Sequence, residues 1–181
     1  MKKQLLLISF ACLAMVCLPA CEDLFDVEET FTFEHEFSVN SDQTSFESAD
    51  VIDLSASADI IGEYGSKIKE VRVEQLEIWL KSFNGSDTQH LENALIAVSE
   101  AGGSGSGYSI IAEMENLHLQ SLLDSPVVLQ TEKSGQEALE KLATSPPHRF
   151  RLHLNASADE SPVDFTAVVK VTATMVANPL N

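Results

Sequence analysis

Hydrophobic and polar residues alternate along much of this chain with a period of two, which is the pattern of half-buried β-strands. Residues 30–40 place phenylalanine, histidine and valine side chains on one face and polar side chains on the other. In residues 163–177 one parity stays apolar throughout. At about 3.3 Å per residue this last strand would approach about 50 Å, so we expect it to bend or bulge and to contribute to both sheets.

Five further segments are expected to form strands, because apolar residues recur in them between turn residues. These segments are residues 46–55, 69–83, 91–98, 127–129 and 149–154. Within 69–83 the apolar parity changes after Val73, which predicts a β-bulge near Glu74-Gln75. Residues 108–123 fit both helical and strand spacing, and we favour a strand or an irregular segment there.

Two short helices are expected between the strands. The first begins at Ser57 or Asp59 and ends near Gly65. The second begins at a capping box in which Ser134 is the N-cap, and the proline pair at 146–147 ends it. The prediction is an all-β fold: a single β-sandwich of about seven to nine mainly antiparallel strands with one or two short connecting helices.

The N-terminus has the three parts of an export signal. Lys2 and Lys3 form a short positive region, and residues 5–18 are almost wholly apolar. This apolar run is shorter than the ~20 residues that a membrane-spanning helix needs, and a region of small residues follows it. The pattern therefore predicts a signal peptide that is removed from the mature protein.

The end of this segment, Leu18-Pro19-Ala20-Cys21, resembles the lipobox of bacterial lipoproteins. Pro19 stands where that motif usually holds a small or β-branched residue. The resemblance implies cleavage before Cys21 and acyl chains on the Cys21 thiol and amine, so Cys21 is the predicted lipidation site. The other reading of the same residues is an ordinary secretory signal that is cut after Ala20.

The resemblance and the strand pattern together predict a domain organisation. Residues 1–20 would be the signal peptide, residues 21–30 an acidic tether after the lipidated cysteine, and residues 31–181 the β-sandwich domain. The acids of the tether resemble an export signal that some bacterial lipoproteins use to reach the outer face of the outer membrane, but we favour a solvated spacer that holds the domain off the bilayer. We expect the protein in the cell envelope, anchored by lipid at the outer membrane.

The charge of the chain limits its partners. There are 28 acidic residues and 11 Lys and Arg, which gives a net charge of −17. Removal of residues 1–20 takes away Lys2 and Lys3 and no acid, so 9 bases remain and the charge becomes −19. Such a balance excludes nucleic acid as a partner, because phosphate binding needs clustered bases. The acids form either a solvated face or a face that steers a partner.

No catalytic, cofactor-binding or metal-ligating residue is predicted. The five histidines lack metal-ligand spacing, and the acids Asp159, Glu160 and Asp164 are explained by a polar hairpin loop as well as by a calcium site. The glycine-rich residues 101–107 match neither a phosphate-binding loop nor a nucleophile elbow. A site assembled from distant residues leaves no such local signal.

The function that follows is a lipid-anchored envelope module. Its partners would be the membrane, through the acyl chains, and an envelope protein or glycan, bound without catalysis or within an assembly. An exposed aromatic side chain would favour a glycan, and Tyr64, Trp79 and Tyr108 are the candidates. The alternatives are a hydrolase of envelope polymers and a carrier of an apolar ligand between the sheets.

The lipobox predicts that Cys21→Ala releases the protein from membranes, because two or three acyl chains make an anchor effectively permanent and none can form on alanine. Fractionation of cells grown with labelled palmitate measures both attachment and acylation. Cys17→Ala, within the apolar run, is the matched control and should keep the protein membrane-bound. A Cys21→Ala protein that stays with the membrane contradicts the lipoprotein assignment.

Overall fold

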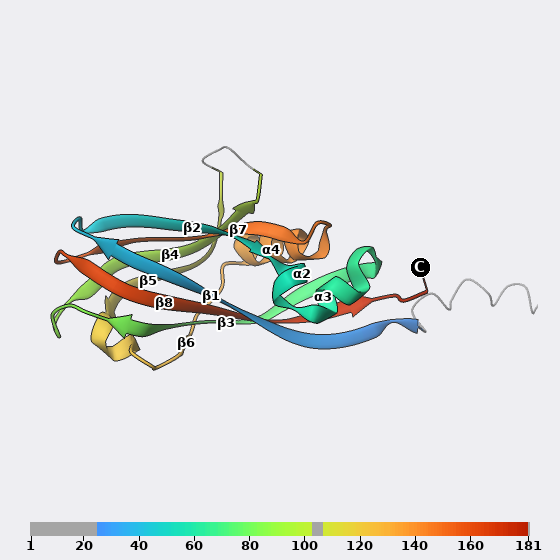
Figure 1. The fold of residues 1–181 in the computed structure, drawn as a ribbon, viewed down its shortest axis with the longest axis horizontal. Coiled ribbons are helices and arrows are strands. Elements are labelled where there is room, and N and C mark those ends of the chain that lie inside the picture. The colour runs from blue at the N-terminus through green and yellow to red at the C-terminus, as the bar shows by residue number, and fades with distance from the viewer. Residues whose placement is uncertain (1–24, 103–106, 181) are drawn as a thin grey trace, which may run out of the picture.

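Eight antiparallel strands form two four-stranded sheets that pack face to face (Figure 1). The computed structural model describes residues 25–102 and 107–180, so Cys21 and part of the glycine-rich segment lie outside the described residues. The strands are β1 (Val27–Ser41), β2 (Ser45–Asp53), β3 (Ile68–Phe83), β4 (His90–Glu100), β5 (Ser109–His118), β6 (Val127–Val128), β7 (Arg149–Ala158) and β8 (Val163–Ala177). The predicted all-β sandwich is confirmed.

The order of the strands gives the sandwich its topology. Sheet A has the order β1-β8-β3-β6, and sheet B has the order β2-β7-β4-β5. Successive strands therefore cross from one sheet to the other, except at β4–β5, which form a hairpin within sheet B. This order of eight strands is that of a double-sheet jelly roll.

The alternating pattern explains the core, because one face of each sheet is apolar and must be buried against the other. In β1 the phenylalanines at 31, 33 and 37 are at most 8% exposed, and in β7 Phe150, Leu152 and Leu154 are at most 1% exposed. The largest fully buried side chains are Phe37, Phe150, Leu54, Ile61, Leu76, Leu80, Ile96, Ile111, Leu119, Leu139, Leu152 and Leu154.

The long strand β8 is the middle of sheet A. It pairs with β1 without interruption and with β3 through three register shifts, one of them at the predicted place between Val73 and Gln75. The predicted bulge is confirmed. The expectation that β8 joins both sheets is wrong: its partner strand accommodates the length and twist through bulges, so β8 stays in one sheet.

Two predicted boundaries shift. β1 begins at Val27 instead of residue 30, because backbone pairing with Ala177 extends the strand where the side-chain alternation has stopped. Residues 27–30, which were predicted to belong to the tether of residues 21–30, are part of β1. β2 ends at Asp53, whose carboxylate caps a new helix by accepting a bond from Ser55 N at 3.1 Å.

Helices are present at both predicted places. The first predicted helix is α3 (Asp59–Tyr64), which begins at one of the two predicted starts and ends beside Gly65. The short helix α2 (Leu54–Ser57) precedes it and the 3-10 helix η3 (Gly65–Lys67) follows it, so Leu54, predicted within a strand, is buried from a helix instead. The ambiguous residues 108–123 form strand β5 and then the 3-10 helix η4 (Leu119–Leu122).

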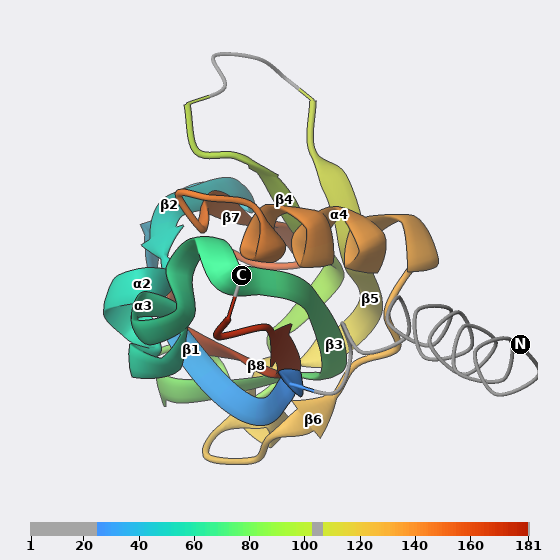
Figure 2. The ribbon, with the colours of Figure 1, turned by 90° about the vertical axis from the view of Figure 1, so that its right-hand side faces the viewer.

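Helix α4 (Lys133–Thr144) packs against β3 of sheet A and β5 of sheet B, and Figure 2 shows it across one end of the sandwich. Three of its side chains form hydrogen bonds with backbone groups of β3 that a neighbouring strand would otherwise pair with. Val71 N donates to Thr144 Oγ1 at 2.9 Å, Val73 N donates to Glu140 Oε1 at 2.9 Å, and Gln136 Nε2 donates to the Val73 carbonyl at 3.1 Å. The edge is therefore satisfied without a full-length strand.

The capping box predicted at Ser134 is wrong. Glu132 is the N-cap residue without a side-chain cap bond, so Ser134 lies inside the first turn and is exposed. The helix starts earlier because Glu132 N donates to the Ile111 carbonyl at 2.7 Å, which ties this end of the helix to β5. The end before the proline pair is confirmed, since the helix stops at Thr144.

Gly135 sets how closely α4 approaches β5. A Cβ at this position would overlap the backbone carbonyl of Ile110 and lie 2.7 Å from Ile111 Cα. Gly135→Ala should therefore lower the free energy of unfolding by about 1–3 kcal/mol through overpacking. An ordinary glycine-to-alanine change inside a helix instead stabilises by about 1 kcal/mol.

Urea denaturation of the two variants Gly135→Ala and Ser134→Ala measures this difference. The neighbouring serine is exposed and caps nothing, so its variant should stay within about 0.5 kcal/mol of the parent. A Gly135→Ala protein as stable as the parent would show that α4 does not contact the β5 backbone this closely.

Candidate functional site

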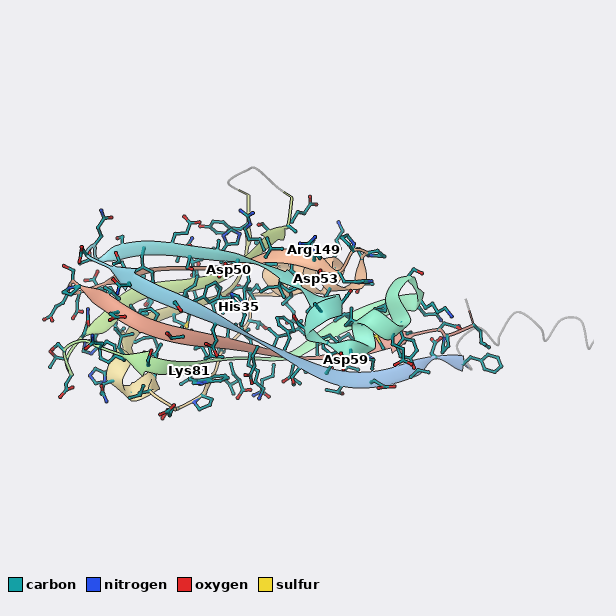
Figure 3. The ribbon with its side chains drawn as sticks, viewed as in Figure 1. His35, Asp50, Asp53, Asp59, Lys81 and Arg149 are labelled. Atoms are coloured by element: carbon teal, nitrogen blue, oxygen red, sulfur yellow. The ribbon has the colours of Figure 1, made fainter. Side chains whose placement is uncertain are left out.

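The histidines singled out by sequence do not assemble into one site. His35 faces β2, and its Nε2 lies 3.1 Å from Asp50 Oδ2, which links the edge strands of the two sheets (Figure 3). His148 is buried with its Nδ1 2.8 Å from the Ala143 carbonyl. Among residues 25–102 and 107–180, no group of three His, Cys, Asp or Glu residues is arranged to hold a metal ion.

Two histidines do meet at the far end of the β4–β5 hairpin. His90 and His118 are cross-strand partners with ring centroids 4.8 Å apart. His118 Nε2 lies 2.6 Å from the Asp87 carbonyl oxygen, and His90 Nδ1 lies 3.7 Å from Asp159 Oδ2. These contacts fasten the turns at this end of the sandwich to one another.

The acids considered for calcium serve the same turns. Asp159 Oδ1 accepts a bond from His90 N at 2.9 Å, and Asp164 Oδ2 accepts one from Asn84 Nδ2 at 3.2 Å. The Glu160 backbone carbonyl accepts a bond from Gln89 Nε2 at 2.8 Å. The structure therefore gives these three residues separate partners in the connection between β3 and β4 and at the first residue of β4.

The three candidate aromatic residues fall in different places. Tyr64 and Trp79 are half-buried, the first at the end of α3 and the second on the outer face of β3. Burial raises the pKa of the Tyr64 hydroxyl, and the charges of Glu29 and Glu63 raise it further. Tyr108 is 39% exposed, and its ring centroid lies 5.5 Å from that of His153 on sheet B.

The outer face of sheet A carries ion pairs, several of which reach across β8 to join β3 with β1 or with the residue just before it. Lys81 Nζ lies 2.8 Å from Glu36 Oε1, and this hydrogen bond raises the pKa of the Lys81 ammonium. Lys170 Nζ lies 3.1 Å from Glu77 Oε2 in the same sheet. The other pairs of this face are Arg72–Glu28, Arg72–Glu70 and Lys69–Asp26.

The outer face of sheet B is different, because it is hollowed and acidic. A hollow of about 570 Å³ crosses all four strands of the sheet. Its main cross-strand row joins Glu47, Asn155, Leu95 and Glu113 in register, one residue from each strand. The next row joins Ser45, Ser157, Asn93 and Glu115. We call the hollow bounded by these eight residues the sheet B groove.

The groove lacks basic residues. Its lining contains the carboxylates Glu47, Glu113 and Glu115 and no Lys or Arg. Glu113 and Glu115 are exposed and form no ion pair with any described residue, and the side chain of Glu47 is 63% exposed. Asn155 also lines the groove, and its amide oxygen Oδ1 is buried without a hydrogen-bond partner among the described residues.

Beside the groove, three polar residues stand in a row across the sheet. Ser99 Oγ lies 2.9 Å from His153 Nε2, and His153 Nδ1 lies 3.7 Å from Glu47 Oε1. The order of the three groups is that of a serine nucleophile, its base and the carboxylate that orients the base. No pattern in the sequence pointed to this row, because the three residues come from β4, β7 and β2.

The contacts of His153 argue against catalysis by this row. The separation of 3.7 Å between Nδ1 and the carboxylate is too long for a hydrogen bond, so Glu47 does not fix the imidazole. His153 is 8% exposed and the Tyr108 ring packs on it, which covers the base from the solvent side. The arrangement suits a side chain that supports Tyr108 and the groove wall.

The sequence missed the groove for a clear reason. Serine, asparagine and glutamate on the solvent side of a strand are read as an ordinary polar face, and each strand contributes only two groove residues. What joins them is the register of β2, β7, β4 and β5. The one sequence signal was the absence of bases from 82–132, which contains both β4 and β5.

Comparisons with known proteins add no family. No protein-family model and no curated protein matches the chain. Among solved structures it is similar to Desmodium yellow mottle tymovirus at 8% identity and a TM-score of 0.34, over 83% of this chain and 89% of that one. It is similar to Turnip yellow mosaic virus at 11% identity and a TM-score of 0.36, over 84% of this chain and 93% of that one. It is also similar to the decameric BFDV capsid protein at 11% identity and a TM-score of 0.37, over 83% of this chain and 99% of that one. Likenesses this distant carry no argument about function.

The geometry of Ser99 predicts that it does not react as an activated nucleophile. A fluorophosphonate probe should label the wild-type protein no more than it labels Ser99→Ala, because the imidazole is neither oriented by Glu47 nor open to the probe. Mass spectrometry of the labelled protein identifies the modified residue. Labelling at Ser99 that His153→Ala abolishes would establish a catalytic site.

Proposed function

We propose that this protein is a lipoprotein of the bacterial cell envelope, held at the outer membrane by acyl chains on Cys21. Its jelly-roll domain binds a partner protein in the sheet B groove and does not catalyse a reaction. The anchor rests on the lipobox-like residues, which lie outside the described part of the chain. The binding role rests on one observation: the hollow of about 570 Å³ on the outer face of sheet B, which is lined by three carboxylates and no Lys or Arg.

The positions of the first and last strands indicate which end of the sandwich an anchor on Cys21 would hold near the membrane. β1 starts and β8 ends at the same end of the sandwich, with Val27 paired to Ala177 (Figure 1). Five residues lie between Cys21 and Val27, and the six residue steps that join them span at most about 22 Å when fully extended. An anchor on Cys21 would therefore keep this end close to the bilayer.

The groove lies toward the opposite end. Its residues Ser45 and Ser157 are next to the turns that join β1 to β2 and β7 to β8, where β1 has reached its last residues. The 15 residues of β1, at about 3.3 Å each, place this end about 50 Å from the anchored end. The groove would thus lie on the part of the sandwich far from the membrane, where a partner in the envelope can reach it.

The described residues favour a surface ligand over an apolar one between the sheets. The inner faces are filled by large side chains such as Phe37, Phe150 and Leu152, which are fully buried.

No helix in residues 25–102 or 107–180 is long and apolar enough to cross a membrane. A protein partner is favoured over a glycan, because the aromatic ring in the groove lining, Phe46, is half-buried and packs edge-on against Phe165, which leaves it poorly placed for a sugar to stack on.

Site-specific crosslinking in whole cells tests the proposed function. A photoreactive phenylalanine at Asn93, which is exposed in the groove, should give a defined crosslinked product. The same residue at Thr32, which is exposed on sheet A, is the matched control and should give none.

Three results would contradict the proposal. These are no product from position 93, the same product from both positions, and turnover of a cell-wall glycan that Glu113→Gln abolishes. The last result would replace binding by hydrolysis.

A further inference from the structure

We infer that the sheet B groove binds an extended basic segment of a partner protein, with two Lys or Arg side chains held by Glu47 and Glu113. This inference rests on the proposed function and adds the chemistry of the ligand. It follows from three features of the groove: its charge, the hydrogen-bond acceptors that it exposes, and its width.

The first feature is charge without compensation. On sheet A each basic side chain has an acidic neighbour, as in Lys81–Glu36 and Lys170–Glu77. The groove carries three carboxylates and no base, although it lies in the same sandwich. Carboxylates that face one hollow repel one another, so a cation bound between them relieves that repulsion.

The second feature is the set of hydrogen-bond acceptors that the groove exposes. The carboxylates of Glu47, Glu113 and Glu115 line the groove, are exposed, and can only accept hydrogen bonds when ionised. A ligand that fits these groups must supply N–H donors, and a guanidinium or ammonium group supplies them together with the charge.

The third feature is the width of the site. Glu47 and Glu113 stand on the two outer strands of sheet B and belong to one cross-strand row. Three interstrand spacings of about 4.8 Å separate them, which is about 14 Å. An extended peptide advances about 3.3 Å per residue, so residues four apart are separated by about 13 Å and lie on the same side. The basic side chains would therefore be four residues apart.

The centre of the row fits the peptide between its two basic residues. Leu95 lies between Asn155 and Glu113 and is half-buried, so it offers an apolar contact to the side chain midway between the bases. The small residues Ser45 and Ser157 in the next row leave room for the backbone. The peptide would cross the sheet and leave the strand edges unused.

Fluorescence anisotropy of a labelled peptide tests the inference on the full-length protein in neutral detergent. The peptide consists of glycine and serine with two arginines four residues apart. We expect saturable binding that Glu47→Gln with Glu113→Gln weakens about tenfold or more, since each charged hydrogen bond lost is equivalent to about a factor of ten. Both glutamates have exposed side chains, so the melting temperature should not change.

Two controls separate the site from general attraction to an acidic protein. The double variant Glu34→Gln with Glu74→Gln removes the same charge from exposed positions of sheet A and should bind as the parent does. A peptide with adjacent arginines carries the same charge and should bind more weakly. Binding should also fall as ionic strength rises from about 0.01 M to about 1 M, where the Debye length shrinks from about 30 Å to about 3 Å.

Several results would overturn the inference. Equal weakening by the sheet A variant would mean that the net charge alone attracts the peptide. Undiminished binding of a peptide with citrulline at both positions, or stronger binding of a neutral oligosaccharide, would mean that the groove does not select a cation. If position 93 still crosslinks a partner in cells, only the ligand class fails; if it does not, the proposed function fails as well.

Discussion

The pairing of β8 with two neighbours is the interaction on which the sandwich depends. β8 gives backbone partners to β1 on one side and to β3 on the other, over nearly the full length of each. Its inward side chains, among them Phe165, Val169 and Met175, are at most 2% exposed and fill the core below sheet B. Loss of this strand would therefore break both the sheet and the packing between the sheets.

The edges of β3, β1 and β2 are protected against pairing in two ways. On one side α4 satisfies the edge of β3 through Gln136, Glu140 and Thr144. On the other side the edge strands β1 and β2 carry acids, and His35 joins Asp50 between them (Figure 3). Charges on edge strands oppose pairing with another chain. A partner is thus more easily received on the outer face of a sheet than at its edge.

How well each structural feature could be predicted depends on how far apart in the sequence its interacting residues lie. The strands, the bulge after Val73 and the helix end before the proline pair were predicted, because alternation and turn chemistry act between near neighbours. The start of α4 was not, since the bond from Glu132 N to the Ile111 carbonyl joins two distant segments. The start of β1 at Val27 was missed for the same reason, because Ala177 holds it.

The sequence by itself determined the all-β class, the excess of acids and the lipobox-like residues around Cys21, which are all local or summed properties of the chain. The tertiary structure decided which strands are neighbours. It brought Glu47 and Glu113 into one row with Asn155 and left their charges without a base. The physical reason is that the side-chain period of a strand is local, whereas its register with another strand depends on closing a long loop against the whole core.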